Sequence, residues 1–134
     1  FYKDLLALPR ARLVPRTYSS YRLIAHAVAA ATVTGSAAFE SIVRGKPALV
    51  FGPFAYQYAP GVFPIHSSDD CRKALRAIFD SREKPTLRDV RIYLKALQDV
   101  SLSGYHDERR THVPREEADR IVRDFSAALI AKIR

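Results

Sequence analysis

The residues best suited to chemistry are a glycine, two hydroxyls and a carboxylate in the first third of the chain. Thr34, Gly35 and Ser36 form a small turn, and Glu40 comes four residues after Ser36. At the start of a helix, such a turn presents free backbone amides and hydroxyls beside the partial positive charge of the helix end. These groups suit an anion, above all a phosphate, and the glycine lets a ligand approach the main chain.

Glu40 suits a different part of the same ligand. It lies one helical turn beyond Ser36, on the same side of the predicted helix. A carboxylate does not attract phosphate, but it accepts hydrogen bonds from the hydroxyls of a ribose or a sugar. The alternative is a connecting turn that binds nothing, with Glu40 a solvated helix residue. Glycine turns are common in α/β folds, so the turn alone favours neither interpretation.

A βαβ unit is expected to position these residues. The apolar runs 30–33 and 48–51 are typical of buried parallel strands. The segment between them predicts a short helix that Ser36 caps, and Gly45 suits the left-handed position after its end. Ligands bind at the carboxyl ends of the strands in open α/β sheets, so the turn 34–36 lies where a site is expected.

These spaced elements resemble the donor-binding signature of GT-B glycosyltransferases. The match comprises Thr-Val-Thr-Gly-Ser at 32–36, Glu40, Gly-Lys-Pro at 45–47 and the apolar strand after it. It is most similar to the bacterial capsular polysaccharide biosynthesis family, which includes Kdo transferases. Tyr56 and the Pro-Gly-Val at 60–62 extend the resemblance, which covers about residues 12–80. It implies that Thr34, Gly35 and Ser36 hold the donor phosphate and that Glu40 holds ribose or sugar hydroxyls.

Further candidates lie in loops expected at the same edge of the sheet. The run 12–15 predicts a strand, and the resemblance makes the loop after it the one that contacts the base. The loop after 48–51 borders donor and acceptor in GT-B enzymes, and its tyrosines suit stacking on a base or sugar. Helix capping by the serines, aromatic packing and an ordinary turn histidine remain open alternatives. The candidates are Arg16, Thr17, Ser19 and Ser20 in the first loop, Tyr56 and Tyr58 in the second, and His66 after the predicted strand 62–65.

The second half of the sequence predicts helices and little chemistry. Apolar periodicity predicts helices that begin near Ser67, near Pro85 and near Arg115. Cys71 falls on an apolar stripe and is expected in the core. The polar loop 101–114 contains two histidines without the spacing of a zinc site, so no metal is expected. The last helix has a stripe expected to be buried, formed by Ala118, Ile121, Val122, Phe125, Ala128 and Leu129.

The composition indicates an ordinary globular domain in a reducing compartment. Of 134 residues, 48% are hydrophobic and 27% charged, and a single cysteine excludes an internal disulfide. No apolar run has the length of a membrane span, and no secretory leader stands at the start. The net charge of +8 suits anionic ligands or lipid. The basic residues are spread out and interleaved with acids, which argues against specific nucleic-acid binding.

We therefore expect an α/β fold, a Rossmann-like parallel sheet flanked by helices, with extra helices at the C-terminus. Residues 1–134 would form a single domain. A start at Phe1 and the lack of methionine suggest a fragment of a longer two-domain protein. By resemblance, the chain is one half of a GT-B fold and binds the nucleotide-sugar donor of a glycosyltransferase in capsular or surface polysaccharide biosynthesis. No catalytic residue is identifiable, so the fragment alone is expected to be inactive.

The resemblance also sets expectations about partners. The nucleotide-sugar, with CMP-Kdo or a UDP-sugar as candidates, is a substrate and not a resident cofactor. The other partners are a glycan acceptor and the N-terminal domain of the same protein, in the bacterial cytoplasm at the inner face of the inner membrane. The residues leave two alternatives open: a non-catalytic nucleotide-sugar or anion-binding module, and a basic, membrane-associated interaction domain.

Overall fold

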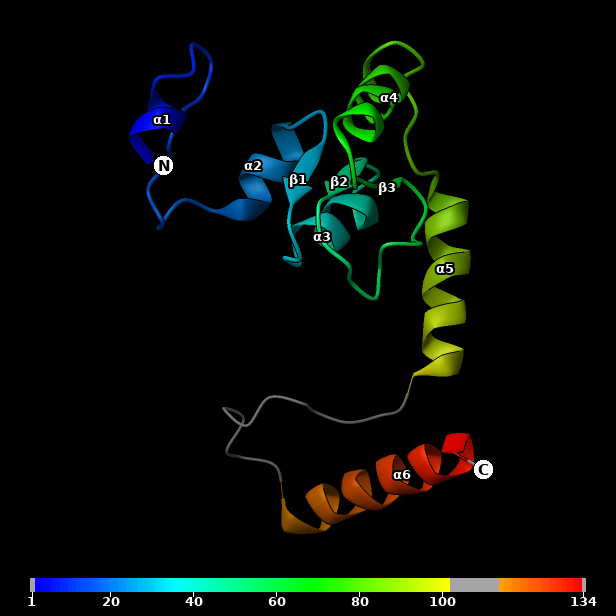
Figure 1. Ribbon diagram of the computed structural model, residues 1–134. Coiled ribbons are helices and arrows are strands. Elements are labelled where there is room, and N and C mark those ends of the chain that lie inside the picture. Colours follow the sequence, from blue (N-terminus) through cyan, green and yellow to red (C-terminus); the bar gives the residue numbers. More distant parts are fainter. Residues whose placement is uncertain (1, 102–113, 134) are drawn as a thin grey trace. The chain divides into compact units, whose positions relative to one another are not determined.

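The computed structural model describes residues 2–101 and 114–133 (Figure 1). The chain divides into two compact units, Phe1–Val90 and Arg91–Arg134. In chain order the elements are α1 (Tyr2–Leu6), α2 (Ser20–His26), β1 (Ala30–Thr32), α3 (Ala37–Val43), β2 (Ala48–Val50), β3 (Val62–Pro64), α4 (Ser68–Phe79), α5 (Leu87–Val100) and α6 (Arg115–Ile133). The helices expected near Ser67, Pro85 and Arg115 are confirmed.

A small parallel sheet forms the centre of the first unit. Its strand order is β1-β2-β3, with Ala48 of β2 paired to Ala30 on one side and to Val62 on the other. All three residues of β2 are buried, as expected for a strand covered on both faces. Pro64 lies in the edge strand β3, where its missing N–H disrupts no internal ladder. The structure confirms the α/β class with a parallel sheet flanked by helices, consistent with a Rossmann-like fold.

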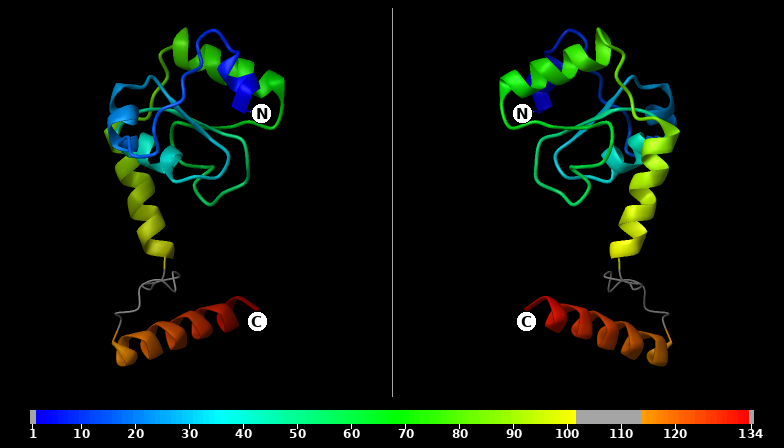
Figure 2. Two further views of the ribbon diagram at one scale, coloured as in Figure 1. Left: turned by 90° about the vertical axis from the view of Figure 1, so that its left-hand side faces the viewer. Right: turned by 90° about the vertical axis from the view of Figure 1, so that its right-hand side faces the viewer.

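Helices α3 and α4 cover opposite faces of this sheet. Leu49 points to one face and packs with Ile65 of the following segment and with Ala74 and Ile78 of α4. The neighbours of Leu49 in β2 point to the other face because side chains alternate along a strand. There α3 packs on β1 and β2, with Ile42 fully buried. Figure 2 shows α4 on the far side of the strands from α3.

The connection from α3 to β2 is fixed by its own hydrogen bonds. The buried Ser41 hydroxyl donates to the carbonyls of Lys46 and Pro47, at 3.3 Å each. Gly45 has φ +69°, which confirms the left-handed position expected after the helix. The helix itself ends at Val43, so its start at the turn 34–36 and its end at Gly45 face opposite edges of the sheet.

One expectation about the first unit is wrong. Residues 12–15 form no strand, and both Leu13 and Val14 are at least half exposed. Two apolar residues before a proline bury too little surface to hold a strand without a paired neighbour. In α6, taken by itself, Val122 and Phe125 of the apolar stripe are 63% and 59% exposed. Most of the predicted loop 101–114 lies outside the described residues.

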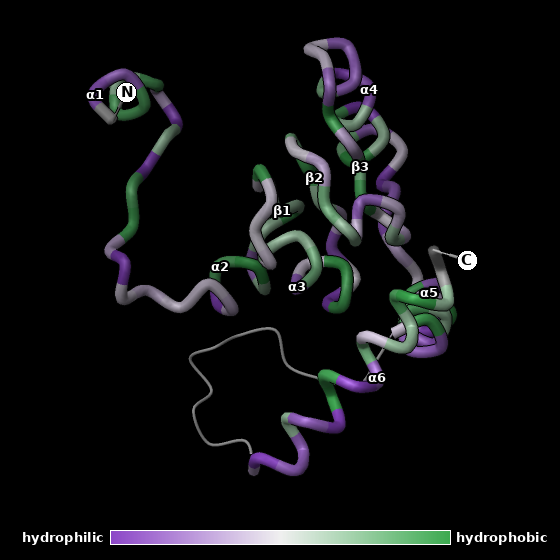
Figure 3. The backbone as a smooth tube through the Cα atoms, turned by 60° about the horizontal axis from the view of Figure 1, so that its bottom comes forward, coloured by the Kyte–Doolittle hydropathy of each residue, from purple (hydrophilic) through white to green (hydrophobic). Residues whose placement is uncertain are grey.

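The helices differ in how far their polar and apolar residues lie on separate faces. Figure 3 shows hydrophilic and hydrophobic residues following one another along α6. Within residues 2–101 and 114–133, no helix combines the length and the apolar character that crossing a bilayer requires.

Truncation of Ile42 tests the core between α3 and the sheet. Ile42→Ala removes buried methyl groups and leaves a cavity, so we expect a loss of about 2–5 kcal/mol in the free energy of unfolding. Ile92→Ala is the matched control, since Ile92 is 58% exposed on another helix and should cost about 0.5 kcal/mol or less. Urea denaturation followed by circular dichroism measures both values, and equal losses would contradict this account of the core.

Candidate functional site

The segments that follow β1 and β2 meet at the carboxyl edge of the sheet. The Phe51 amide donates to the Thr32 carbonyl at 3.0 Å, and the Gly52 amide donates to the Val33 carbonyl at 2.9 Å. A Cβ added at Gly52 would lie 2.9 Å from Cγ2 of Thr34. The loop after β2 can therefore lie against the turn after β1 only because residue 52 has no side chain.

The turn 34–36 is exposed, and one of its amides is already bonded. Thr34, Gly35 and Ser36 are all exposed to solvent. The Gly35 amide donates to Oγ1 of Thr32 at 3.0 Å, so it is not the free amide that the sequence predicted. A Cβ added at Gly35 would lie 2.8 Å from the same oxygen. A side chain at residue 35 would therefore displace the Thr32 hydroxyl, whether or not a ligand approaches.

Ser36 binds Glu40 instead of capping the helix. Ser36 stands at the N-cap position of α3, but its side chain accepts no amide hydrogen bond. Its hydroxyl donates to Oε1 of Glu40 at 2.9 Å. The predicted cap is not formed, because Ser36 has helical φ and ψ of −59° and −15° instead of the extended angles of a capping residue. The Ser36 side chain therefore does not cap the first amides of α3.

The second oxygen of Glu40 is shielded from solvent and has no partner. Among the described residues, Oε2 of Glu40 is the buried side-chain oxygen without a hydrogen bond. Unsatisfied buried polar atoms are rare, and a charged one is more costly than a neutral one. The carboxylate is held in place at Oε1 and needs a donor at Oε2, which a ligand hydroxyl can supply.

Tyr56 fastens the loop after β2 onto the turn. Its hydroxyl donates to the Gly35 carbonyl, and its ring packs against Phe54 and Phe39 with centroids 4.6 Å and 6.1 Å away. Only 6% of Tyr56 is exposed, and desolvation by burial raises the pKa of its phenol. Tyr56 therefore has a packing role, whereas Tyr58 is 83% exposed and can contact a ligand.

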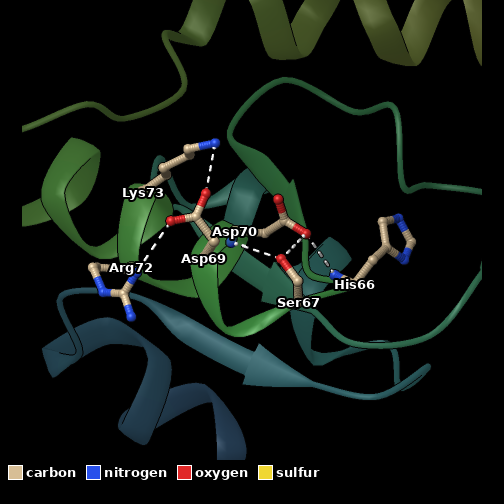
Figure 4. A network of polar contacts seen from close by, with 6 residues as sticks. All are labelled: His66, Ser67, Asp69, Asp70, Arg72 and Lys73. Atoms are coloured by element: carbon tan, nitrogen blue, oxygen red, sulfur yellow. Dashed lines mark hydrogen bonds and ion pairs between the residues drawn. The ribbon is translucent and has the colours of Figure 1, made fainter.

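A polar network follows β3 at the same edge (Figure 4). Ser67 caps α4, since its Oγ accepts from the Asp70 amide at 3.1 Å and donates to Oδ2 of Asp70 at 2.9 Å. The His66 amide donates to the same oxygen at 3.2 Å. The Ser67 hydroxyl and then the His66 amide hold the pKa of Asp70 below its ordinary value. The exposed His66 imidazole points away from the network and takes no part in it.

Among the described residues, no hydrogen bond joins the candidate loop before α2 to the turn 34–36. Arg16, Thr17, Ser19 and Ser20 are all exposed. Ser19 stands at the N-cap of α2 without a side-chain cap hydrogen bond. The cap expected from this serine is therefore not made.

Sequence reasoning missed two residues that build this edge. Thr32 holds the Gly35 amide, and Gly52 allows the loop to lie on the turn. A glycine directly after a buried strand was a usable signal for Gly52. Thr32 gave no such signal, because threonine is a common residue in strands. Within residues 2–101 and 114–133, no group of three His, Cys, Asp or Glu side chains is arranged to hold a metal ion.

Comparisons with protein-family models, with curated proteins and with solved structures found no match to this chain. Any assignment of function therefore depends on the motif around the turn 34–36 and on the geometry of this edge.

The hydroxyl of Tyr56 provides a first test of how this edge is held together. Tyr56→Phe keeps the ring contacts and removes the hydrogen bond to Gly35, so we expect the free energy of unfolding to fall by about 0.5–1.5 kcal/mol. Tyr58→Phe, at a largely exposed tyrosine, should leave it unchanged. Thermal denaturation measures both variants. A Tyr56→Phe chain as stable as the Tyr58→Phe chain would contradict the anchoring role.

The pH dependence of stability tests the Asp70 network. A carboxyl whose folded pKa is lowered contributes stability above its ordinary value of 3.8, and that stability is lost as the pH falls through the folded pKa. Asp70→Asn should therefore be less stable than the parent at neutral pH, with a difference that shrinks below about pH 4. In a Ser67→Ala background, the difference should be smaller at neutral pH. If the stability difference between Asp70→Asn and its parent depended neither on pH nor on Ser67, the role given to the Asp70 carboxylate would be refuted.

Proposed function

We propose that the chain is the nucleotide-sugar donor-binding half of a GT-B glycosyltransferase that acts in capsular or surface polysaccharide biosynthesis. The observation that carries the proposal is the carboxylate of Glu40. One oxygen is fixed by Ser36, and the other lacks a donor, directly beside an exposed turn that fits the motif. A ribose or sugar hydroxyl is the donor that the motif implies.

The donor phosphate would lie on the turn itself. The hydroxyl of Thr34 and the amide of Ala37, which Ser36 does not cap, would be the donors there. They favour negative charge, and they stabilise the leaving nucleotide phosphate more strongly as the glycosyl bond breaks. The Gly35 amide is not among these donors, because it is bonded to Thr32. The net charge of +8 favours approach of an anionic donor.

The sugar or ribose would lie against Glu40. Its terminal torsion is soft, and the carboxylate would have to rotate before a ligand hydroxyl could reach the buried Oε2. Ser36 then acts as a positioning residue, since its hydroxyl keeps the other oxygen in place. Tyr58 lies on the loop that the Tyr56 hydroxyl bonds to the turn, is 83% exposed, and would stack on the ligand.

The transfer step would require a second domain. The resemblance places the acceptor and the catalytic base in a separate α/β domain of the same protein, with the donor between the two. The acceptor would be a growing glycan at the inner face of the bacterial inner membrane. A non-catalytic nucleotide-sugar-binding module is the second candidate. It would bind the same donors, but the two-domain protein would show no sugar transfer.

Substitution of Glu40 tests the proposal without disturbing Gly35. Glu40→Ala removes the hydroxyl acceptor, so we expect UDP-glucose and CMP to bind at least about tenfold more weakly. Binding of inorganic pyrophosphate should be unchanged or stronger, because a negative charge near the turn is lost. Isothermal titration calorimetry measures all three ligands, and circular dichroism confirms that the variant is folded.

Asp124→Ala is the matched control, since it removes an exposed helical carboxylate from α6 and changes the net charge equally. This control should bind UDP-glucose and CMP with the same affinity as the parent chain. Equal losses for pyrophosphate and for the nucleotides in Glu40→Ala would refute the role given to Glu40. Absence of nucleotide binding by the parent chain would refute the proposed function.

A further inference from the structure

A hollow lies at the amino edge of the sheet, away from the turn 34–36. It has a volume of about 860 Å³, within the range of small-molecule sites. Its walls are the segments that enter β1 and β2, the ends of α3 and α4, and the connection from α4 to α5. All of these belong to the first unit. Because the strands are parallel, these segments gather at the edge opposite the candidate donor site.

The hollow is strongly basic. Arg44, Lys46, Arg82 and Lys84 line it, with Glu83 as its one carboxylate. The ion pairs among the described residues involve none of Lys46, Arg82 and Lys84. These three cations are therefore available to an anion. Arg44 is partly engaged, since its guanidinium donates to the Glu40 carbonyl and lies 4.5 Å from the centre of the Tyr21 ring.

The connection that carries two of these cations is fixed in an unusual conformation. Arg82 has φ +54°, which is uncommon and strained for a residue with a side chain. The Glu83 amide donates to the Ala77 carbonyl at 2.9 Å. Pro85 is buried against Gly61, where an added Cβ would lie 2.6 Å from its Cδ. The backbone thus holds residues 82–84 at the hollow in one arrangement.

The hollow also has apolar walls. Val28, Phe79 and Leu87 line it, and each is more than half exposed. An inorganic ion would leave these side chains in water, whereas a ligand with an apolar body would cover them. Cations and exposed apolar side chains on one hollow therefore fit an amphipathic anion.

Stabilisation of helix ends does not account for these cations. Basic residues favour the C-terminal turn of a helix, but the effect falls off within that turn. Lys46 lies beyond the end of α3, and Arg82 and Lys84 lie beyond the end of α4. All three residues lie on the connecting segments that line the hollow.

We propose that this basic hollow binds a ligand that carries a phosphate on an apolar body, at a site separate from the donor site. Lys46, Arg82 and Lys84 bind the phosphate, and Phe79 covers the apolar body. The phosphate belongs either to a soluble molecule such as a nucleoside monophosphate or to the headgroup of an anionic lipid. Both sources offer the same chemistry to the hollow, and binding assays distinguish them.

The test uses the double variant Arg82→Asn, Lys84→Gln of the full chain. Asparagine tolerates the positive φ at residue 82, so the connection keeps its conformation. The two probes are AMP, measured by calorimetry, and phosphatidylcholine vesicles with and without phosphatidylglycerol, measured by co-sedimentation. We expect the parent to bind AMP or the phosphatidylglycerol vesicles, and the double variant to bind that probe at least about tenfold more weakly.

The matched control is Arg120→Gln, Arg123→Gln, which removes the same charge from exposed positions on α6. It should change the affinity less than about twofold. AMP binding would identify a soluble ligand, and vesicle binding alone would identify a lipid. Equal losses in the two double variants, or a parent that binds neither probe, would overturn the proposal.

Discussion

The parallel pairing of β2 with a strand on each side is the constraint on which the rest of the first unit depends. Parallel strands enter a sheet at one edge and leave it at the other, so each connection must begin and end at a defined edge. The turn 34–36, the loop after β2 and the cap of α4 consequently gather at the carboxyl edge. The segments before β1 and β2 and the connection after α4 gather at the amino edge.

The two edges have different chemistry. The carboxyl edge is built on close backbone packing, in which Gly52 lies against Thr34 and the Gly35 carbonyl accepts from Tyr56. This packing leaves an exposed turn with one constrained carboxylate, that of Glu40. The amino edge is built on a rigid connection around Arg82 that presents basic side chains to an open hollow. The first edge thus offers a hydroxyl-accepting carboxylate beside exposed main chain, and the second offers several cations.

Local signals predicted the parts of the fold that local chemistry determines. The runs that became β1 and β2, the left-handed Gly45 and the helix that begins near Ser67 each depend on a few neighbouring residues, and all are confirmed. The failures involve backbone conformation or distant partners. Ser36 has helical backbone angles and caps no amide, and the run 12–15 needed a neighbouring strand that it does not have. The bond between the Tyr56 hydroxyl and the turn, like the basic hollow, joins segments far apart in sequence, which no single stretch reveals.

Amide chemical shifts in the presence of a nucleotide test the central claim most directly. In a ¹⁵N-labelled sample titrated with UDP-glucose, the account predicts that the largest changes fall on the amides of residues 34–40 and 52–58. The amides that line the basic hollow, at residues 44–47 and 82–86, should change less. Changes confined to the hollow, or no changes at either edge, would contradict the assignment of donor binding to the carboxyl edge.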